Sequence, residues 1–182
     1  MLQGKIIARF FTRGRERMNV TTTQMKDFPT RVRGNSFDDF TVGTVFDHHW
    51  GRTIEQSDNN LFSLTTLQLN PLFFNREYAK ANGHPDIVVA PMLVFATAFG
   101  LSVEDLSERG GAFLGVDDLS FEAPVRVGDT LTARSAVQAL RPSKSDSNYG
   151  IATWLTEGFN QRGERVIVFT RSNLVPRRDA QL

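Results

Sequence analysis

Residues 91–101 read PMLVFATAFGL and carry no charged side chain. Proline suits the first position of a helix, so Pro91 predicts a helix that begins there. Because this helix is apolar on nearly every side, it has no face to offer to water, and other parts of the chain must surround it. Gly100 would let a neighbouring segment approach closely. We therefore expect this helix to lie at the centre of the fold.

The chain before this helix has the pattern of one strand and two helices. A strand is expected over residues 42–53, and a helix over residues 55–67. One face of that helix could be formed by four side chains, Leu61, Phe62, Leu64 and Thr65. Asn70-Pro71 ends this region, and a short helix is expected over residues 75–81 with Asn75 as its N-cap.

After the apolar helix, the hydrophobic period changes to that of strands. Residues 131–139 alternate in the way of a half-buried strand, and three further segments are rich in strand-forming side chains, 113–122, 150–159 and 165–175. Helices followed by a run of antiparallel strands indicate the α+β class. An apolar helix wrapped by one curved antiparallel sheet is the hotdog arrangement, so we expect a single hotdog domain.

The composition agrees with one globular domain. Of the 182 residues, 40% are hydrophobic and 23% are charged, which is ordinary for such a domain. There is no cysteine, which excludes disulfides, zinc–cysteine sites and a thiol nucleophile. This fits a reducing compartment, and we expect a cytoplasmic protein. No apolar run approaches the ~18 residues of a membrane span, so no span is expected.

The N-terminal residues differ from the rest in charge. Residues 1–17 hold five basic side chains against Glu16 alone, a local charge of +4, which leaves 16 basic and 19 acidic side chains, or −3, for the remainder. A transit peptide, a surface anchor, a disordered extension or translation from upstream of a start at Met18 would each give this pattern. We expect a flexible extension over 1–27 and the hotdog domain over 28–182. The acidic body argues against nucleic acid as a partner.

Several phrases resemble the MaoC-like dehydratase family in their order along the chain. They are Gly51-Arg52-Thr53-Ile54 with Asp58, Leu69-Asn70-Pro71-Leu72 with Tyr78-Ala79, Val88–Leu101, Ala123-Pro124-Val125, Gly128-Asp129-Thr130-Leu131 and Phe159-Asn160-Gln161-Arg162-Gly163-Glu164. Each phrase alone is unspecific, but together they cover about residues 37–176 in the family's order. The phrases at 52–58 and 150–164 look most like the branch that contains mesaconyl-CoA hydratase and β-methylmalyl-CoA dehydratase.

The resemblance implies chemistry on acyl-CoA thioesters, with no cofactor. In this family a carboxylate and an imidazole form a general acid/base pair around one water. The usual Asp lies two residues before the Asn-Pro pair and the usual His two residues after it, which places them at Gln68 and Phe73, on either side of Asn70. Glutamine can orient a water but cannot exchange a proton near neutral pH, and phenylalanine does neither.

The resemblance also implies a backbone N–H that donates to the thioester oxygen as negative charge develops there. The usual glycine falls on Pro91, which has no N–H to donate. A gap of one residue would place the donor at Met92 or Ala90. The positions that carry the family's chemistry therefore hold variant residues throughout.

Other residues could contribute to a site. His48 and His49 are interpreted as a structural or surface pair, since no spaced ligand accompanies them as a metal site would need. His84, in a loop, could instead reach the space left by Phe73. Asp58 is either a helix cap or a surface acid. Three cations are candidates for binding the phosphates of coenzyme A or are solvated surface charges, Arg141, Lys144 and Arg171.

Two functional hypotheses remain. In the first, the chain is an acyl-CoA hydratase or dehydratase in which Gln68 positions water and a non-standard group moves the proton. In the second, it is a non-catalytic hotdog subunit that binds acyl-CoA or pairs with a chain that carries the Asp and the His. A single sheet leaves an exposed edge and a half-built cleft, so we expect a homodimer or a heterodimer.

Overall fold

The computed structural model describes residues 33–180, and the expected extension over 1–27 lies outside the described residues. Residues 33–180 form six strands: β1 (Val45–Asp47), β2 (Arg52–Thr53), β3 (Phe113–Phe121), β4 (Thr130–Pro142), β5 (Tyr149–Phe159) and β6 (Arg165–Pro176). The α-helices of this described part are α2 (Gln56–Thr66), α3 (Arg76–Ala81), α4 (Pro91–Leu101) and α5 (Val103–Leu106), and its 3-10 turns are η2 (Phe37–Asp39) and η3 (Pro71–Phe73).

The strands form one antiparallel sheet in the order β1-β4-β5-β6-β3, and β2 also pairs with β4. The three long strands β4, β5 and β6 follow one another in sequence and lie side by side at its centre. Burial alternates along the whole of β5, over residues 130–137 of β4 and over residues 167–175 of β6, as in a sheet with one covered face. β3 is the edge next to β6 and runs for nine residues, whereas β1 at the other edge has only three.

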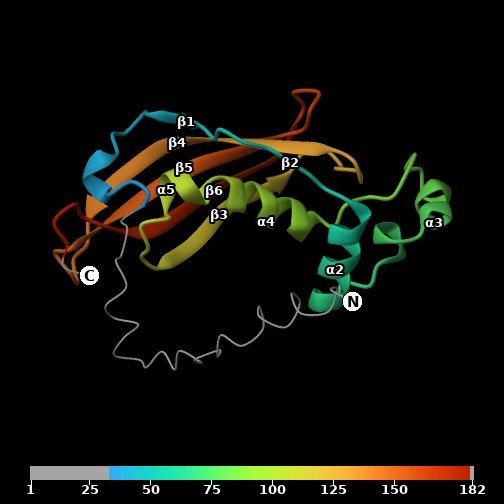
Figure 1. Cartoon of the computed structure of the whole chain (residues 1–182), viewed down its shortest axis with the longest axis horizontal. Coiled ribbons are helices and arrows are strands. Elements are labelled where there is room, and N and C mark those ends of the chain that lie inside the picture. The colour runs from blue at the N-terminus through green and yellow to red at the C-terminus, as the bar shows by residue number, and fades with distance from the viewer. Residues whose placement is uncertain (1–32, 181–182) are drawn as a thin grey trace, which may run out of the picture. The chain divides into compact units, whose positions relative to one another are not determined.

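Helix α4 lies across the covered face of the sheet (Figure 1). Its buried side chains Val94, Ala98 and Leu101 join a core formed with residues of the sheet such as Leu131 and Phe169. Each buried aliphatic side chain of this kind contributes about 1.5–3 kcal/mol. The predicted central apolar helix, and with it the α+β hotdog class, is confirmed.

The close approach of helix and sheet depends on Gly158 rather than on Gly100. A Cβ on Gly158 would lie 2.6 Å from Ile167 Cγ2 and 3.4 Å from Ala98 Cβ, whereas a Cβ on Gly100 would meet nothing within 4 Å. The expectation for Gly100 was therefore wrong. The glycine that admits the helix is on the sheet, directly beneath Ala98.

Two further expectations from the sequence differ from the structure. The strand expected over 42–53 is interrupted, and only β1 and β2 remain of it. In α2 the expected apolar face is wrong, because Leu61 and Leu64 are exposed and the buried side chains are Asn59 and Ser63. A polar inner face is possible because the segments beneath α2 present backbone groups that Asn59 can bind.

Candidate active site

An apolar cavity of about 210 Å³ opens beside the N-terminus of α4. It is lined by the segment that leads into the helix, by the first turn of the helix and by the end of β3 with the chain that follows it: Val88, Val89, Pro91, Val94, Phe121, Glu122, Ala123, Pro124 and Val125. Helix α2 and helix α3 gather at this same end of the sheet (Figure 1).

Asn59 ties together the three segments that build this end. Its Nδ2 donates to the carbonyl oxygen of Phe73 at 2.7 Å and to that of Val88 at 3.0 Å, and its Oδ1 accepts the N–H of Ala90 at 2.9 Å. The side chain is fully buried, so these bonds satisfy backbone groups that water cannot reach. Sequence analysis missed Asn59, because a single Asn within a helical pattern gives no signal of what it binds.

The residues at the family's acid and base positions lie between α2 and α3, in the segment whose Phe73 carbonyl oxygen accepts a hydrogen bond from Asn59. Asn70 is the N-cap of η3, where its Oδ1 accepts the N–H of Leu72 at 3.0 Å. Phe73 is buried, with 8% of its surface exposed. Gln68 is half-buried, and its side chain has no hydrogen-bond partner among residues 33–180. No imidazole or carboxylate is hydrogen-bonded to Gln68 within those residues.

The structure distinguishes between the two alternative N–H donors. The N–H of Ala90 is bound by Asn59, so it is not available to a ligand. The N–H of Met92 is at the N-terminus of α4 and has no acceptor within residues 33–180. The first N–H groups of a helix lack intrahelical partners and favour negative charge. Met92 therefore offers the free donor beside Pro91.

The three cations considered for coenzyme A phosphates are not together. Arg141 is exposed at the end of β4, and Lys144 is exposed in the loop that follows. Arg171 is fully buried, which is not the surface position that a phosphate in solvent would meet. Its guanidinium lies 4.3 Å from the centre of the Phe99 ring, and burial lowers the pKa of Arg171 to about 10.

His48 belongs to a buried polar chain that joins α5 to the sheet. Its Nδ1 lies 2.6 Å from Asp105 Oδ2 and its Nε2 lies 2.9 Å from Ser135 Oγ, which in turn lies 2.8 Å from Thr156 Oγ1. These distances match those of a Ser-His-Asp triad. Ser135 is buried with 1% exposure, however, and its hydroxyl is occupied by His48 and Thr156, so no substrate carbonyl has access to it. The structural interpretation of His48 is supported.

The remaining candidates lie apart from the cavity. Asp58 caps α2 by accepting the N–H of Glu55 at 3.0 Å, and it also pairs with Arg52 at 2.7 Å. His49 is exposed and stacks on Trp50. His84 lies in the turn after α3, and no hydrogen bond joins it to Gln68 within the described part of the chain. Residues 33–180 contain no group of three or more possible metal ligands.

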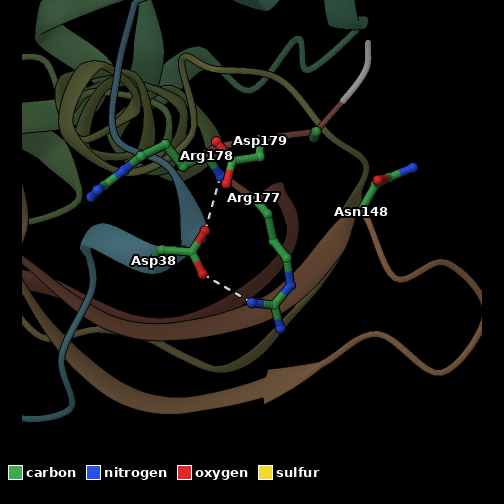
Figure 2. Close-up of a pocket in the computed structure, with 6 residues that line it drawn as sticks. Asp38, Asn148, Arg177, Arg178 and Asp179 are labelled. Carbon is green, nitrogen blue, oxygen red and sulfur yellow. Dashed lines mark hydrogen bonds and ion pairs between the residues drawn. The ribbon is translucent and has the colours of Figure 1, made fainter.

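A second cavity, of about 290 Å³, lies beside the C-terminal end of β6 and is polar (Figure 2). Arg177 Nη1 donates to Asp38 Oδ1 at 2.9 Å, and the backbone N–H of Arg178 donates to Asp38 Oδ2 at 2.9 Å. The Arg178 guanidinium binds Asp39 at 2.5 Å. Because the arginines that line this cavity are paired with carboxylates, it offers no free cation for an acyl-CoA phosphate.

Two of the phrases shared with the MaoC-like dehydratases serve the fold. Asp129 Oδ1 accepts hydrogen bonds from Gln161 Nε2 at 2.7 Å and from Arg162 Nη1 at 2.9 Å, and Asp129 Oδ2 accepts the N–H of Arg126 at 2.9 Å. The start of β4 is thereby bound to the hairpin loop between β5 and β6. The residues of these two phrases therefore hold the two loops in place and have a structural role.

With this geometry in place, comparison with known proteins assigns the family. A family model described as mesaconyl-CoA hydratase matches residues 17–181. The chain belongs to the mesaconyl-CoA hydratase family. A mesaconyl-CoA hydratase from Haloarcula hispanica is 36% identical over 151 residues, which is 82% of this chain and 42% of that protein. The predicted branch of the MaoC-like dehydratases is confirmed.

Solved structures have the same fold as this chain, and some of them are about twice as long as the part that it matches. A putative MaoC domain dehydratase from Chloroflexus aurantiacus superposes with a TM-score of 0.77 at 31% identity, over 85% of this chain and 44% of that one. A Mycobacterium tuberculosis protein described as having a double hotdog fold gives a TM-score of 0.69 at 27% identity, over 84% of this chain and 47% of that one. This mesaconyl-CoA hydratase family chain thus spans less than half the length of these relatives.

Within residues 33–180, none of the helices of this family member combines the length and apolar character that crossing a bilayer requires.

Proposed function

We propose that this chain binds enoyl-CoA or hydroxyacyl-CoA thioesters and takes part in the addition or loss of water across their α,β bond. In this proposal the domain supplies the acyl-binding half of the site, and a second hotdog domain supplies the acid and the base. The observation that supports it is the apolar cavity at the start of α4, which Pro91 lines, together with the N–H of the next residue, Met92, which has no acceptor within residues 33–180. A cytoplasmic location remains a prediction.

The residues at the acid and base positions support a division of labour. The side chains of Gln68 and Phe73 cannot exchange a proton near neutral pH, and Phe73 is also buried. A general acid or base must lie within hydrogen-bond reach of the proton that it moves. Because no imidazole or carboxylate is hydrogen-bonded to Gln68 within residues 33–180, we expect a second domain to supply the acid and the base.

The exposed edge strand β3 supports the hypothesis that a second hotdog domain pairs with this one. Among residues 33–180, β3 has a neighbouring strand on one side only, and three of its large apolar side chains are about half exposed, Phe113, Leu114 and Phe121. A long edge strand with apolar side chains favours pairing with another strand. Relatives in which a comparable domain makes up less than half of the chain have the length for two such domains. The second domain can be a second copy, another chain or a further part of a longer protein.

The proposal is tested by measuring hydration of crotonyl-CoA through the loss of its enoyl absorbance. The chain alone is expected to bind the thioester and to show no hydration above background. Hydration should appear when a hotdog chain with an intact Asp and His is co-expressed and co-purified with it. If neither acyl-CoA binding nor hydration is found in either sample, the proposal is wrong.

One observation favours a second candidate, a self-sufficient variant site. The Gln68 amide is half-buried with no partner within residues 33–180, so it could orient a water. In that case the chain alone would hydrate crotonyl-CoA, and Gln68→Ala would abolish the activity. In the favoured proposal, Gln68→Ala changes no activity of the isolated chain because there is none.

A further inference from the structure

Two adjacent carboxylates lie at the middle of the edge strand β3. Asp117 and Asp118 are both exposed, and neither forms an ion pair within residues 33–180. The neighbouring strand supplies no counter-charge, because Asp117 lies opposite Thr170 in the register of β3 and β6. The residues on either side, Val116 and Leu119, pack against the core around α4. Apolar side chains therefore fix the strand to its own domain, while two negative charges stand at the centre of its exposed edge.

The backbone of β3 is irregular at the same place. Its pairing with β6 shifts register between Asp117 and Ser120, and Asp118 has a backbone φ of 53°, in the left-handed region. Bulges and charged side chains are two means by which edge strands avoid unwanted pairing. The ends of the strand are apolar and about half exposed, at Phe113, Leu114 and Phe121. The edge thus combines apolar ends that favour pairing with a charged centre that restricts the partner.

The geometry of strand pairing makes a second copy of this chain an unsuitable partner. A twofold-symmetric antiparallel pairing over all nine residues of β3 places Asp117, the midpoint of the strand, opposite itself. Side chains directly opposite each other have Cβ atoms about 4.5–5.5 Å apart. Moving the symmetry centre by one residue shortens the overlap by two residues, from nine to seven, and still leaves the two Asp117 side chains as diagonal neighbours about 7–8 Å apart. With Asp118 beside each of them, four carboxylates gather at the symmetry axis in either register.

From this arrangement we infer that the β3 edge rejects a second copy of this chain and accepts a hotdog domain of different sequence, with basic side chains at the middle of its edge strand. This inference rests on the proposed function, in which a second hotdog domain completes the site, and it names the kind of domain. Like charges opposite each other in a sheet are destabilising, whereas opposite charges at the same positions stabilise the pair. The charged centre of β3 therefore provides specificity, and its apolar ends provide affinity.

The first test compares the self-association of the full chain with that of the double variant Asp117→Asn, Asp118→Asn, by sedimentation velocity at micromolar concentrations. The amides keep the size of the side chains, and Asn tolerates the left-handed backbone at residue 118 as Asp does. The double variant should dimerise with a dissociation constant at least about tenfold below that of the wild type, because the repulsion is removed. The matched control is Asp47→Asn with Glu77→Gln, which removes the same charge at two exposed positions away from β3 and should behave as the wild type.

The second test supplies an edge strand of opposite charge. The variant Asp117→Lys, Asp118→Asn makes the centre of β3 positive, and it serves as the probe for a basic partner. An equimolar mixture with the wild type should form a mixed dimer at least about tenfold more tightly than either chain pairs with itself. Raising the salt concentration from about 0.1 M to about 1 M should weaken the mixed dimer, because the attraction is screened. Adding Leu114→Asn to both chains should also weaken it, which assigns the contact to β3.

The outcomes separate this inference from the proposed function. A wild-type dimer that the Asn double variant does not tighten overturns the inference, because the carboxylates then do not oppose self-pairing. A mixture that stays monomeric overturns it as well, and if the chain still binds crotonyl-CoA, the proposed function stands. If the mixed dimer forms but crotonyl-CoA is neither bound nor hydrated, the inference stands and the proposed function fails. Should the Lys variant not fold, the Asn double variant decides alone.

Discussion

The side-chain oxygen of Asn59 accepts the backbone N–H of Ala90 at 2.9 Å, across 31 positions of sequence. The amide nitrogen of the same side chain binds the carbonyl oxygens of Phe73 and Val88. One buried side chain thus fixes the position of the turn after α2 relative to the start of α4. It also occupies the N–H of Ala90, whereas the N–H of Met92 has no acceptor within residues 33–180.

Asn59→Ala should destabilise the fold by about 2–4 kcal/mol, because three buried backbone groups lose their partner. Urea unfolding followed by circular dichroism measures the change. Asn60→Ala is the matched control, since Asn60 is the next residue of the same helix, is exposed and binds only Gln56. A shift of the same size in both variants would mean that helix propensity, and not the buried bonds, sets the cost.

Asp129 should make stability depend on pH. Burial tends to raise the pKa of Asp129, but hydrogen bonds from Arg162, the Arg126 N–H and Gln161 outweigh it and hold the pKa below its usual value of 3.8. The ionised carboxylate is therefore favoured in the folded state, and its contribution is present above about pH 4 and lost as the pH falls through the lowered pKa. The urea midpoint of Asp129→Asn should be lower than that of the wild type at pH 7, and the gap should narrow as the pH falls below 3.8. Asp117→Asn, at an exposed position, should show no such gap.

Arg171 should cost stability rather than supply it. Its guanidinium is fully buried and forms no ion pair within residues 33–180, and two of its nitrogen atoms, Nε and Nη1, have no hydrogen-bond partner. Taking a charge out of water costs several kcal/mol, and against this cost stand a hydrogen bond to the Ser102 carbonyl oxygen at 3.3 Å and the contacts with the Phe99 and Trp154 rings. Arg171→Met is expected to leave the melting temperature unchanged or raise it, as differential scanning calorimetry would measure. A marked fall would mean that the charge has a partner that these contacts do not include.

The sequence predicted the fold well because its strongest patterns extend over many residues and agree with one another. The apolar run at 91–101 can only be a buried helix, and the alternating segments from residue 113 onward can only cover it as strands. Details that depend on one local contact could not be predicted. The sequence does not say that Gly158, rather than Gly100, lies beneath Ala98, because that choice depends on strand register.

For the candidate site, the sequence predicted which positions to consider but not the contacts or the burial of their side chains. The order of the phrases predicts a site at Gln68, Phe73 and Pro91, and the structure shows that Asn59 joins the backbone of Phe73 to that of Ala90, next to Pro91. Whether a charged residue is buried or exposed depends on the face of its strand, which is why Arg171 was taken for a possible surface cation.

The β3 edge should form the interface with the second domain. Leu114→Lys should reduce self-association or pairing with a partner chain, because it places a charge on an apolar edge. Val45→Lys is the matched control, since Val45 is equally exposed on the short strand at the opposite edge of the sheet. Sedimentation velocity at micromolar concentration measures the effect. A wild-type chain that is a monomer alone and in the presence of a partner hotdog chain would contradict the assembly.

Restoring the family's acid and base tests the placement of the site. Gln68→Asp combined with Phe73→His should give the isolated chain measurable hydration of crotonyl-CoA, since a positioned acid or base contributes ~100-fold or more. One oxyanion donor lowers the activation free energy by ~3 kcal/mol. Because the N–H of Met92 is already free beside Pro91, adding Pro91→Gly should lower the activation free energy by much less than this. The single variants Gln68→Asp and Phe73→His serve as controls and should remain near background, because each lacks the other half of the pair. If the triple variant folds, binds crotonyl-CoA and remains inert, the chemistry is not located at Gln68 and Phe73.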